Sequence, residues 1–373
     1  MRKLKGENTN WANPDFSIEQ PVLTLEDFPV YMGCVDDSFD PADDYVADLQ
    51  FGVCPVTGTI QSMNRMPAEL VYLRPHNACI GKTWREHHEA FAKFILSKVP
   101  KNAVVCEIGG GDGYIASKCV EHVKEWHIIE PNLPDAHFEH PRLVYHSGYY
   151  PNVSTKGADV VVHSNLLEHI RNPKEFLAGM DAPIQLFSVP HFEYAMSHGY
   201  PSILNFEHEN ALTREVMVQL LTSCGYAHKA RNYNDFTWFY EAYRVSGGVD
   251  SPICCRATNA RNLLSMYRDR LVHHAVGLQE GIGNVDGNLY FFGAHIFYTM
   301  LRASGLSAQF TALLDNSPLK IGKRLYGTDL TVFSPEFIIP EESTPIVVVP
   351  RTPYQTEMMV QVKKINPGAR IVC

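Results

Sequence analysis

Strand and helix signals alternate through the middle of the chain, and this alternation constrains the fold more than any other feature. Apolar runs of strand length follow one another from residue 103 onward, separated by segments with helical spacing. The runs are AVVCEIG (103–109), EWHIIEP (125–131), LVYHSG (143–148), the start of ADVVVHSNLLEHI (158–170) and IQLFSVP (184–190). Alternating strands and helices form a parallel sheet covered by helices on both faces. We therefore predict an α/β fold with a doubly wound, Rossmann-like sheet.

Further segments flank this region on both sides. Residues 1–75 are rich in Asp and Pro and show little periodicity, which indicates a small irregular unit with short strands. A second α/β series begins near residue 259, and 373 residues exceed one typical core. This series has helices at 259–279 and 295–304 and strands within 288–296, 307–316, 345–350 and 369–373. We expect three domains, 1–75, 76–250 and 251–373, of which the last is a second Rossmann-like unit.

Composition excludes several classes of protein. Apolar residues make up 45% of the chain and charged residues 20%, as in soluble globular proteins. The net charge of −9 gives no basic surface for nucleic acid or an anionic membrane, and no apolar run spans a bilayer. None of the nine cysteines is paired as C-x-x-C, and the first residues carry no secretion signal. We expect a cytoplasmic protein.

A glycine-rich loop follows the first strand of the predicted central sheet. Its glycines allow a tight turn and let a ligand approach the N-terminus of the next helix. The loop fits two templates. Gly111, Gly113 and Ala116 match the G-x-G-x-x-A form of the dinucleotide fingerprint. Glu107 and Gly109, together with the glycines at 111 and 113, match the E-x-G-x-G-x-G loop typical of S-adenosylmethionine (AdoMet) methyltransferases.

Two carboxylates favour AdoMet over a dinucleotide. Glu107 would repel a pyrophosphate but attract the ammonium and sulfonium groups of AdoMet. Glu130 ends the next strand, where an acid can accept hydrogen bonds from both ribose hydroxyls. We therefore expect AdoMet as cofactor and S-adenosylhomocysteine as product. The predicted cofactor-binding residues are Glu107, Gly109, Gly111, Gly113, Glu130, Pro131, Ser147 and Asn165.

Polar residues gather where the fourth predicted strand ends. His163, Ser164 and Asn165 lie at its carboxyl end, where open α/β sheets bind ligands. Glu168 and His169 follow on what we expect to be the first turn of a helix. LEHIRNP, residues 167–173, resembles a segment common among class I AdoMet methyltransferases. Alternatively, Glu168 only favours a helix N-terminus and His169 is a packed surface residue.

With these motifs in order, the whole chain resembles the three-part sugar C-methyltransferases that act on nucleotide-linked keto-deoxysugars. The resemblance is most specific at the C-terminus, where Asp315, Lys320, Gly322 and Gly327 match a D-x-x-x-x-K-x-G pattern and a later glycine. It implies an N-terminal zinc-bearing module, a central AdoMet domain and a C-terminal α/β domain. The alternative for the last part is an α/β unit that binds nothing and only packs on the first.

The N-terminal module departs from the family pattern. Gly58 and Gln61 match the family's C-x-x-C-G-x-x-Q segment, and Cys54 stands at one ligand position. Thr57 stands at the next, and no earlier cysteine pair is present in residues 1–33. Since tetrahedral zinc needs four good ligands, we predict a degenerate zinc ribbon without metal.

The family's acceptor segment is matched by residues 188–213, which lead to NFEH where the family has Tyr-x-Glu-His. The resemblance implies that His208 is the base that removes a proton α to a ketone and that Glu207 orients it. It places His169 across the acceptor pocket, while Asn205 replaces the tyrosine as a hydrogen-bond donor. Alternatively, this stretch only precedes a helix capped by Thr213.

Four functions remain open at this point. The leading hypothesis is AdoMet-dependent methyl transfer to carbon of a nucleotide-linked keto-deoxysugar. Because Asn205 replaces the tyrosine, the second hypothesis is methyl transfer to an oxygen or nitrogen of a sugar or other small metabolite. The lost tyrosine and zinc ligands also allow a binding protein with a relic methyltransferase core, and an NAD oxidoreductase is the weakest reading. We expect a small-molecule acceptor and neither a nucleic-acid nor a membrane partner; the sequence does not reveal the oligomeric state.

Overall fold

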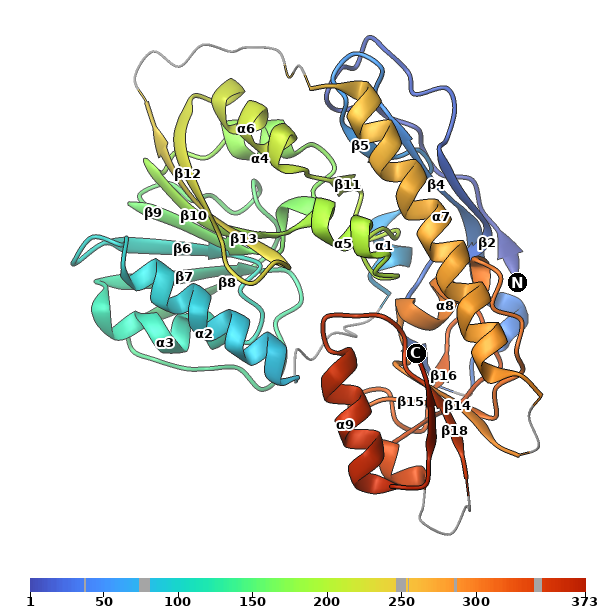
Figure 1. The fold of residues 1–373 in the computed structure, drawn as a ribbon. Coiled ribbons are helices and arrows are strands. Elements are labelled where there is room, and N and C mark those ends of the chain that lie inside the picture. The colour runs from blue at the N-terminus through green and yellow to red at the C-terminus, as the bar shows by residue number, and fades with distance from the viewer. Residues whose placement is uncertain (37, 74–80, 246–252, 254, 285–286, 339–343) are drawn as a thin grey trace.

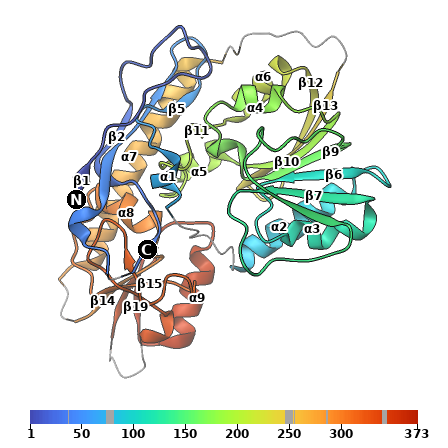
Figure 2. The same cartoon turned by 180° about the vertical axis from the view of Figure 1, so that it is seen from behind.

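Three main β-sheets organise the molecule, and each is built largely from one third of the chain (Figure 1). The computed structural model describes residues 1–373 except 37, 74–80, 246–252, 254, 285–286 and 339–343. The central sheet and its helices form one lobe, and the N-terminal and C-terminal sheets lie on the other side (Figures 1 and 2). None of the helices in the described ranges is both long and apolar enough to cross a membrane.

The central sheet has seven strands in the order β12–β13–β10–β9–β6–β7–β8. They are β6 (Val104–Ile108), β7 (Glu125–Glu130), β8 (Leu143–Ser147), β9 (Val160–Ser164), β10 (Ile184–Pro190), β12 (Tyr226–Asn232) and β13 (Thr237–Arg244). Only β13 runs antiparallel to its neighbours. The predicted doubly wound sheet is therefore confirmed, and the antiparallel hairpin β12–β13 extends it at one edge.

Helices cover both faces of this sheet (Figure 1). One face carries α2 (Lys82–Leu96), α3 (Tyr114–Cys119) and the 3-10 turn η2 (Val120–His122); the other carries α4 (Pro173–Ala178), α5 (Phe192–His198) and α6 (Arg214–Ser223). Phe91 and Ile115 bury the first face, and Phe176 and Leu220 bury the second. The helix expected directly after β9 is only a single 3-10 turn, η3 (Leu167–His169), because Pro173 starts a separate helix soon afterwards.

The N-terminal region is more regular than expected. Its five-stranded sheet contains β1 (Arg2–Lys3), β2 (Leu23–Pro29), β4 (Tyr45–Val53), β5 (Ile60–Ser62) and β11 (Asn210–Ala211), and η1 (Pro41–Asp43) and α1 (Ala68–Val71) lie beside it. The short strands that we predicted are present, but Ala47, Leu49, Phe51 and Val53 alternate along β4 and bury one of its faces, which makes the region more regular. The strand β11 comes from the predicted acceptor segment, so that segment is tied to this sheet.

The C-terminal region forms a five-stranded parallel sheet in the order β17–β15–β14–β18–β19. The strands are β14 (Leu289–Phe292), β15 (Ala312–Leu314), β17 (Val332–Phe333), β18 (Ile346–Val348) and β19 (Arg370–Val372). They are accompanied by α7 (Ala257–Ile282), α8 (Ile296–Ala303), η4 (Pro335–Phe337) and α9 (Gln355–Ile365). The long helix α7 runs from the N-terminal sheet to this one (Figure 2).

A buried ion pair joins the first and last thirds of the chain. Arg324 donates to both carboxylate oxygens of Asp44, at 2.6 and 3.1 Å, and the backbone N–H of Gly327 donates to the same carboxylate. The neighbouring strands β3 (Cys34–Val35) and β16 (Arg324–Leu325) pair with each other. Because the hydrogen-bonded pair is almost fully buried, it holds these two regions in one arrangement.

Candidate active site

The glycine-rich loop adopts the conformation that its glycines make possible. Gly109, Gly111 and Gly113 have φ values of +73°, +55° and +80°, in the region that side chains with a Cβ rarely adopt. Gly113 caps α3, so the loop leads into a helix N-terminus. A Cβ on Gly111 would meet nothing within 4 Å, so the bare backbone faces open space there. This opening fits a ligand that lies directly on the loop.

Glu130 lies beside the loop at the end of β7. One carboxylate oxygen accepts a hydrogen bond from the N–H of Gly111 at 3.1 Å, and the other accepts from Asn132 at 2.9 Å. Ser147 pairs with Glu130 at the end of β8 and is exposed, and Pro131 follows Glu130 directly. The predicted ribose-binding carboxylate therefore sits at the same sheet edge as the open face of the loop.

Glu107 is placed differently from the expectation. Its side chain is buried beneath the loop, where Trp126 Nε1 donates to Oε2 at 2.9 Å. Burial raises the pKa of Glu107 to about 8, against the lowering effect of the Trp126 hydrogen bond. As placed, Glu107 supports the loop from below.

The end of β9 carries a strained residue. Asn165 has a φ of +46°, which is uncommon for a residue with a side chain and is often found at functional sites. Its N–H donates to the Ser188 carbonyl, and its Oδ1 accepts from Ser188 Oγ. His163 does not line the crevice as expected, because it is fully buried and stacks on Phe187 with ring centroids 4.7 Å apart.

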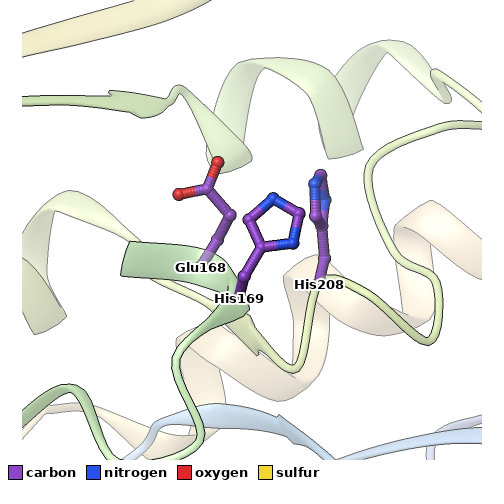
Figure 3. Close-up of side chains that lie close together, drawn as sticks. All are labelled: Glu168, His169 and His208. Atoms are coloured by element: carbon purple, nitrogen blue, oxygen red, sulfur yellow. The ribbon is translucent and has the colours of Figure 1, made fainter. Parts of the chain in front are cut away.

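A second group of polar residues lies next to the glycine loop. Among the described residues, one group of three His, Cys, Asp or Glu side chains is close enough to share a cation: Glu168, His169 and His208 (Figure 3). Their candidate ligand atoms all lie within 4.8 Å of one another. A Cβ on Gly109 would come within 3.4 Å of Leu166, the second residue before Glu168. The two motifs therefore lie close to each other.

Glu168 has an unusual environment within this group. It is fully buried, and neither carboxylate oxygen has a hydrogen-bond partner among the described residues. Burial raises its pKa to about 8. Since a buried polar group without a partner is costly, this carboxyl group needs a functional explanation more than any other in the site.

Tyr72, which follows α1 in the N-terminal region, belongs to the site but was not predicted. Its hydroxyl lies 3.0 Å from His169 Nδ1, while the residue as a whole is 38% exposed. The contact joins residues 97 positions apart. No local pattern around Tyr72 indicates it, because only the folded N-terminal sheet brings α1 to η3.

The loop before β11 positions His208. Asn205 Oδ1 accepts from the N–H groups of Glu207 and His208 at 2.7 and 2.8 Å, so Asn205 shapes the turn. His208 Nδ1 contacts the Ile203 carbonyl at 2.9 Å, which makes Nδ1 the protonated nitrogen and leaves Nε2 as the acceptor. Burial lowers the pKa of His208, so its imidazole is neutral near pH 7. Thr213 caps α6 by accepting from Val216, as predicted.

The N-terminal sheet anchors the other end of this loop. Asn210 Oδ1 accepts from Trp11 Nε1 at 2.6 Å, and its Nδ2 donates to the Ile170 carbonyl at 2.7 Å. Glu209 is held near Arg65 at 3.5 Å. His208 therefore lies where the N-terminal sheet, η3 and the loop before β11 meet.

The remaining family-derived residues make local contacts. The N–H of Thr57 donates to Cys54 Sγ at 3.4 Å, and Asn10 Nδ2 donates to the same sulfur at 3.3 Å. In the C-terminal sheet, Asp315 accepts from Lys320 Nζ at 3.0 Å and from the backbone of Ala294 at 3.1 Å. The Asp315–Lys320 pair thus supports the turn after β14.

Comparison with known proteins gives matches at the level of structure. No protein-family model and no curated protein matches the chain. One solved structure with a matching chain is the Haloferax volcanii complex of a methyltransferase with its activator (13% identity, 43% of this chain, 91% of that chain, TM-score 0.37). Another is 1,6-didemethyltoxoflavin-N1-methyltransferase of Burkholderia thailandensis with bound S-adenosylhomocysteine (13% identity, 44% of this chain, 82% of that chain, TM-score 0.35). A third is the N-methyltransferase NodS of Bradyrhizobium japonicum (15% identity, 43% of this chain, 96% of that chain, TM-score 0.32).

These values are too low to establish a family or a function for this chain. The class is instead defined by its own sheet. Numbered along the chain, the seven strands lie in the order 3-2-1-4-5-7-6, with the seventh antiparallel, and the glycine loop follows the first. This is the class I methyltransferase fold.

Proposed function

We propose that this protein is an AdoMet-dependent methyltransferase that acts on a small-molecule acceptor. The observation that carries the proposal is the loop of three left-handed glycines, open above Gly111 and flanked by Glu130, at the switch point of the sheet. Ligands bind at this point in open α/β sheets. Gly109, Gly111 and Gly113 would let the cofactor lie on bare backbone, and Glu130 would turn to its ribose hydroxyls. Pro131, Ser147 and Asn165 complete the proposed binding edge.

When bound, AdoMet would supply an electrophilic methyl group on its sulfonium, with S-adenosylhomocysteine as the product left after transfer to an electron pair of the acceptor. The protein must hold the acceptor in line and accept its proton. In our proposal His208 Nε2 receives that proton, because Nδ1 is bound to Ile203. Glu207 and His169 orient His208 and the acceptor, and Asn205 holds the loop.

The acceptor that we favour is a nucleotide-linked keto-deoxysugar methylated at carbon. This rests on the sequence resemblance and is supported by Tyr72, whose phenol hydroxyl lies 3.0 Å from His169. A phenol can stabilise an enolate oxygen, so Tyr72 compensates for the tyrosine that Asn205 replaces. A sugar or small metabolite methylated at oxygen or nitrogen is the second candidate, since such transfer needs only one positioned base.

Three domains would share this work. Residues 1–75 supply Tyr72 and anchor the acceptor loop, 76–250 bind the cofactor, and the parallel sheet of 251–373 contributes the other side of a nucleotide-sugar site. We place the enzyme in the cytoplasm because its nine cysteines, an odd number with no C-x-x-C pair, suit a reducing compartment.

Cofactor binding is the first test. We expect AdoMet and S-adenosylhomocysteine, but not NAD, to raise the melting temperature, since a ligand that binds only the native state stabilises it. If neither AdoMet nor S-adenosylhomocysteine raised the melting temperature, the proposal would be refuted. Incubation with candidate acceptors and AdoMet should then add one methyl mass, and His208→Ala should abolish this while the exposed His273→Ala does not. Undiminished transfer by His208→Ala would rule out its role as the base.

A further inference from the structure

Glu168, His169 and His208 have the composition of a transition-metal site. Two imidazoles and one carboxylate are ligands that Zn²⁺, Fe²⁺ and Co²⁺ accept, usually with open positions left for water or substrate. Their candidate ligand atoms lie within 4.8 Å of one another (Figure 3). Zinc bonds of about 2.0–2.2 Å place tetrahedral ligand atoms roughly 3.4 Å apart, so side-chain rotations that move these atoms by about 1 Å would close the site.

The strongest indication comes from Glu168. Both of its oxygens are buried and lack hydrogen-bond partners within the described part of the chain. Protonation alone does not remove the problem, because a neutral carboxyl group still has a donor and an acceptor to satisfy. A cation next to the carboxylate would supply the missing partner and offset the cost of burying a charge.

The two histidines are oriented as metal ligands usually are. Ligating histidines commonly bind a backbone carbonyl or another polar group through the nitrogen that does not face the metal. His208 Nδ1 binds the Ile203 carbonyl at 2.9 Å, and His169 Nδ1 binds the Tyr72 hydroxyl at 3.0 Å. Ligation would therefore use Nε2 of both rings, which stand nearly perpendicular with centroids 4.7 Å apart.

We propose that Glu168, His169 and His208 bind one divalent transition-metal ion, with Zn²⁺ as the reference ion, at the acceptor end of the active site. The sequence had predicted no metal, because the ligands come from η3 and from a loop about 40 residues later, and only the fold joins them. What the ion does rests on the proposed function: it would hold an acceptor oxygen and lower the pKa of that group. His208 Nε2 would then be a ligand instead of the base.

Metal binding can be tested without any acceptor. The full chain is dialysed against a chelator and then titrated with Zn²⁺ by calorimetry, or with Co²⁺ followed by its visible absorption. We expect one ion per chain. His208→Ala and the nearly isosteric Glu168→Gln should each weaken binding at least tenfold, whereas His273→Ala and Cys54→Ala should not.

The outcomes separate this inference from the proposed function. Binding of less than one Zn²⁺ or Co²⁺ per wild-type chain, or binding unchanged in Glu168→Gln, overturns the metal site. AdoMet titrations of the same samples test the function: a chain that binds Zn²⁺ but not AdoMet would refute the methyltransferase and retain the metal site. Circular dichroism of the variants ensures that lost binding is not lost folding, and Glu168→Gln provides the test if His208→Ala fails to fold.

Discussion

Replacement of Gly111 by alanine separates the role of this glycine in the backbone from its role in ligand binding. Gly111 has a φ of +55°, and a Cβ there would have no atom of the described residues within 4 Å apart from its chain neighbours. The left-handed conformation costs a residue with a side chain about 1–2 kcal/mol. Gly111→Ala should therefore lower the free energy of unfolding by about that amount, with no added steric cost inside the protein.

The effect on cofactor binding should exceed the loss of stability. A ligand that lies against the bare Gly111 backbone would meet the new methyl group, since carbon atoms pack about 3.5–4.0 Å apart. We expect AdoMet affinity to fall at least tenfold, which is about 1.4 kcal/mol. Gly157→Ala is the matched control, because Gly157 has a φ of +88°, an equally empty Cβ position and a place in an exposed turn away from the site.

Urea unfolding and calorimetric titration with AdoMet measure the two quantities on the same samples. Both variants should lose a similar amount of stability, and only Gly111→Ala should lose affinity. If Gly111→Ala bound AdoMet within a factor of three of the wild type while showing the expected strain, the cofactor would not lie on this loop as we propose.

Three further predictions concern other parts of the fold. Glu107→Gln should remove a pH dependence of the free energy of unfolding. The pKa of about 8 keeps Glu107 protonated in the folded state, whereas the unfolded chain ionises near pH 4.5. The wild type should therefore lose roughly 5 kcal/mol of stability as the pH rises from about 4.5 to about 8. Urea titrations should show the variant losing less stability over this range than the exposed control Glu89→Gln. Thr213→Ala removes the cap of α6 and should cost about 1 kcal/mol by the same measurement. Asp44→Asn should lower stability by about 3–5 kcal/mol because it leaves a buried guanidinium unpaired, while Asp43→Asn, in an exposed pair, should change little; equal losses would contradict this.

The parts of the fold that were predictable share a local cause. The strands β6, β7, β9 and β10 are short runs of buried residues between helical segments, so the pattern alone locates them. The glycines of the loop and the cap Thr213 are also local, since each is required by the backbone at its own position. A single sequence carries this kind of information directly.

The features that the sequence did not reveal depend on contacts between distant segments. Pairing of β11 with β5 joins Ala211 to Ile60, and nothing in either short segment indicates the other. Trp126 on the neighbouring strand holds Glu107 beneath the loop, and the position of Glu107 before the glycines does not indicate that contact. The contact of Tyr72 with His169 likewise joins residues far apart in the sequence.

The roles of His208 as base and as metal ligand exclude each other at any one moment. With Nδ1 bound to Ile203, the ring has one lone pair, at Nε2, and that pair can bind either a proton or a cation. If the ion is present, another group near the site must accept the proton of the acceptor. His169 cannot do so, because its Nδ1 contacts the Tyr72 hydroxyl and its Nε2 would bind the ion. Glu207, which is buried next to His208 in the chain, is then the carboxylate best placed to receive it. Glu207→Gln should therefore impair the metal-loaded enzyme far more than the metal-free one, whereas His208→Ala should impair both.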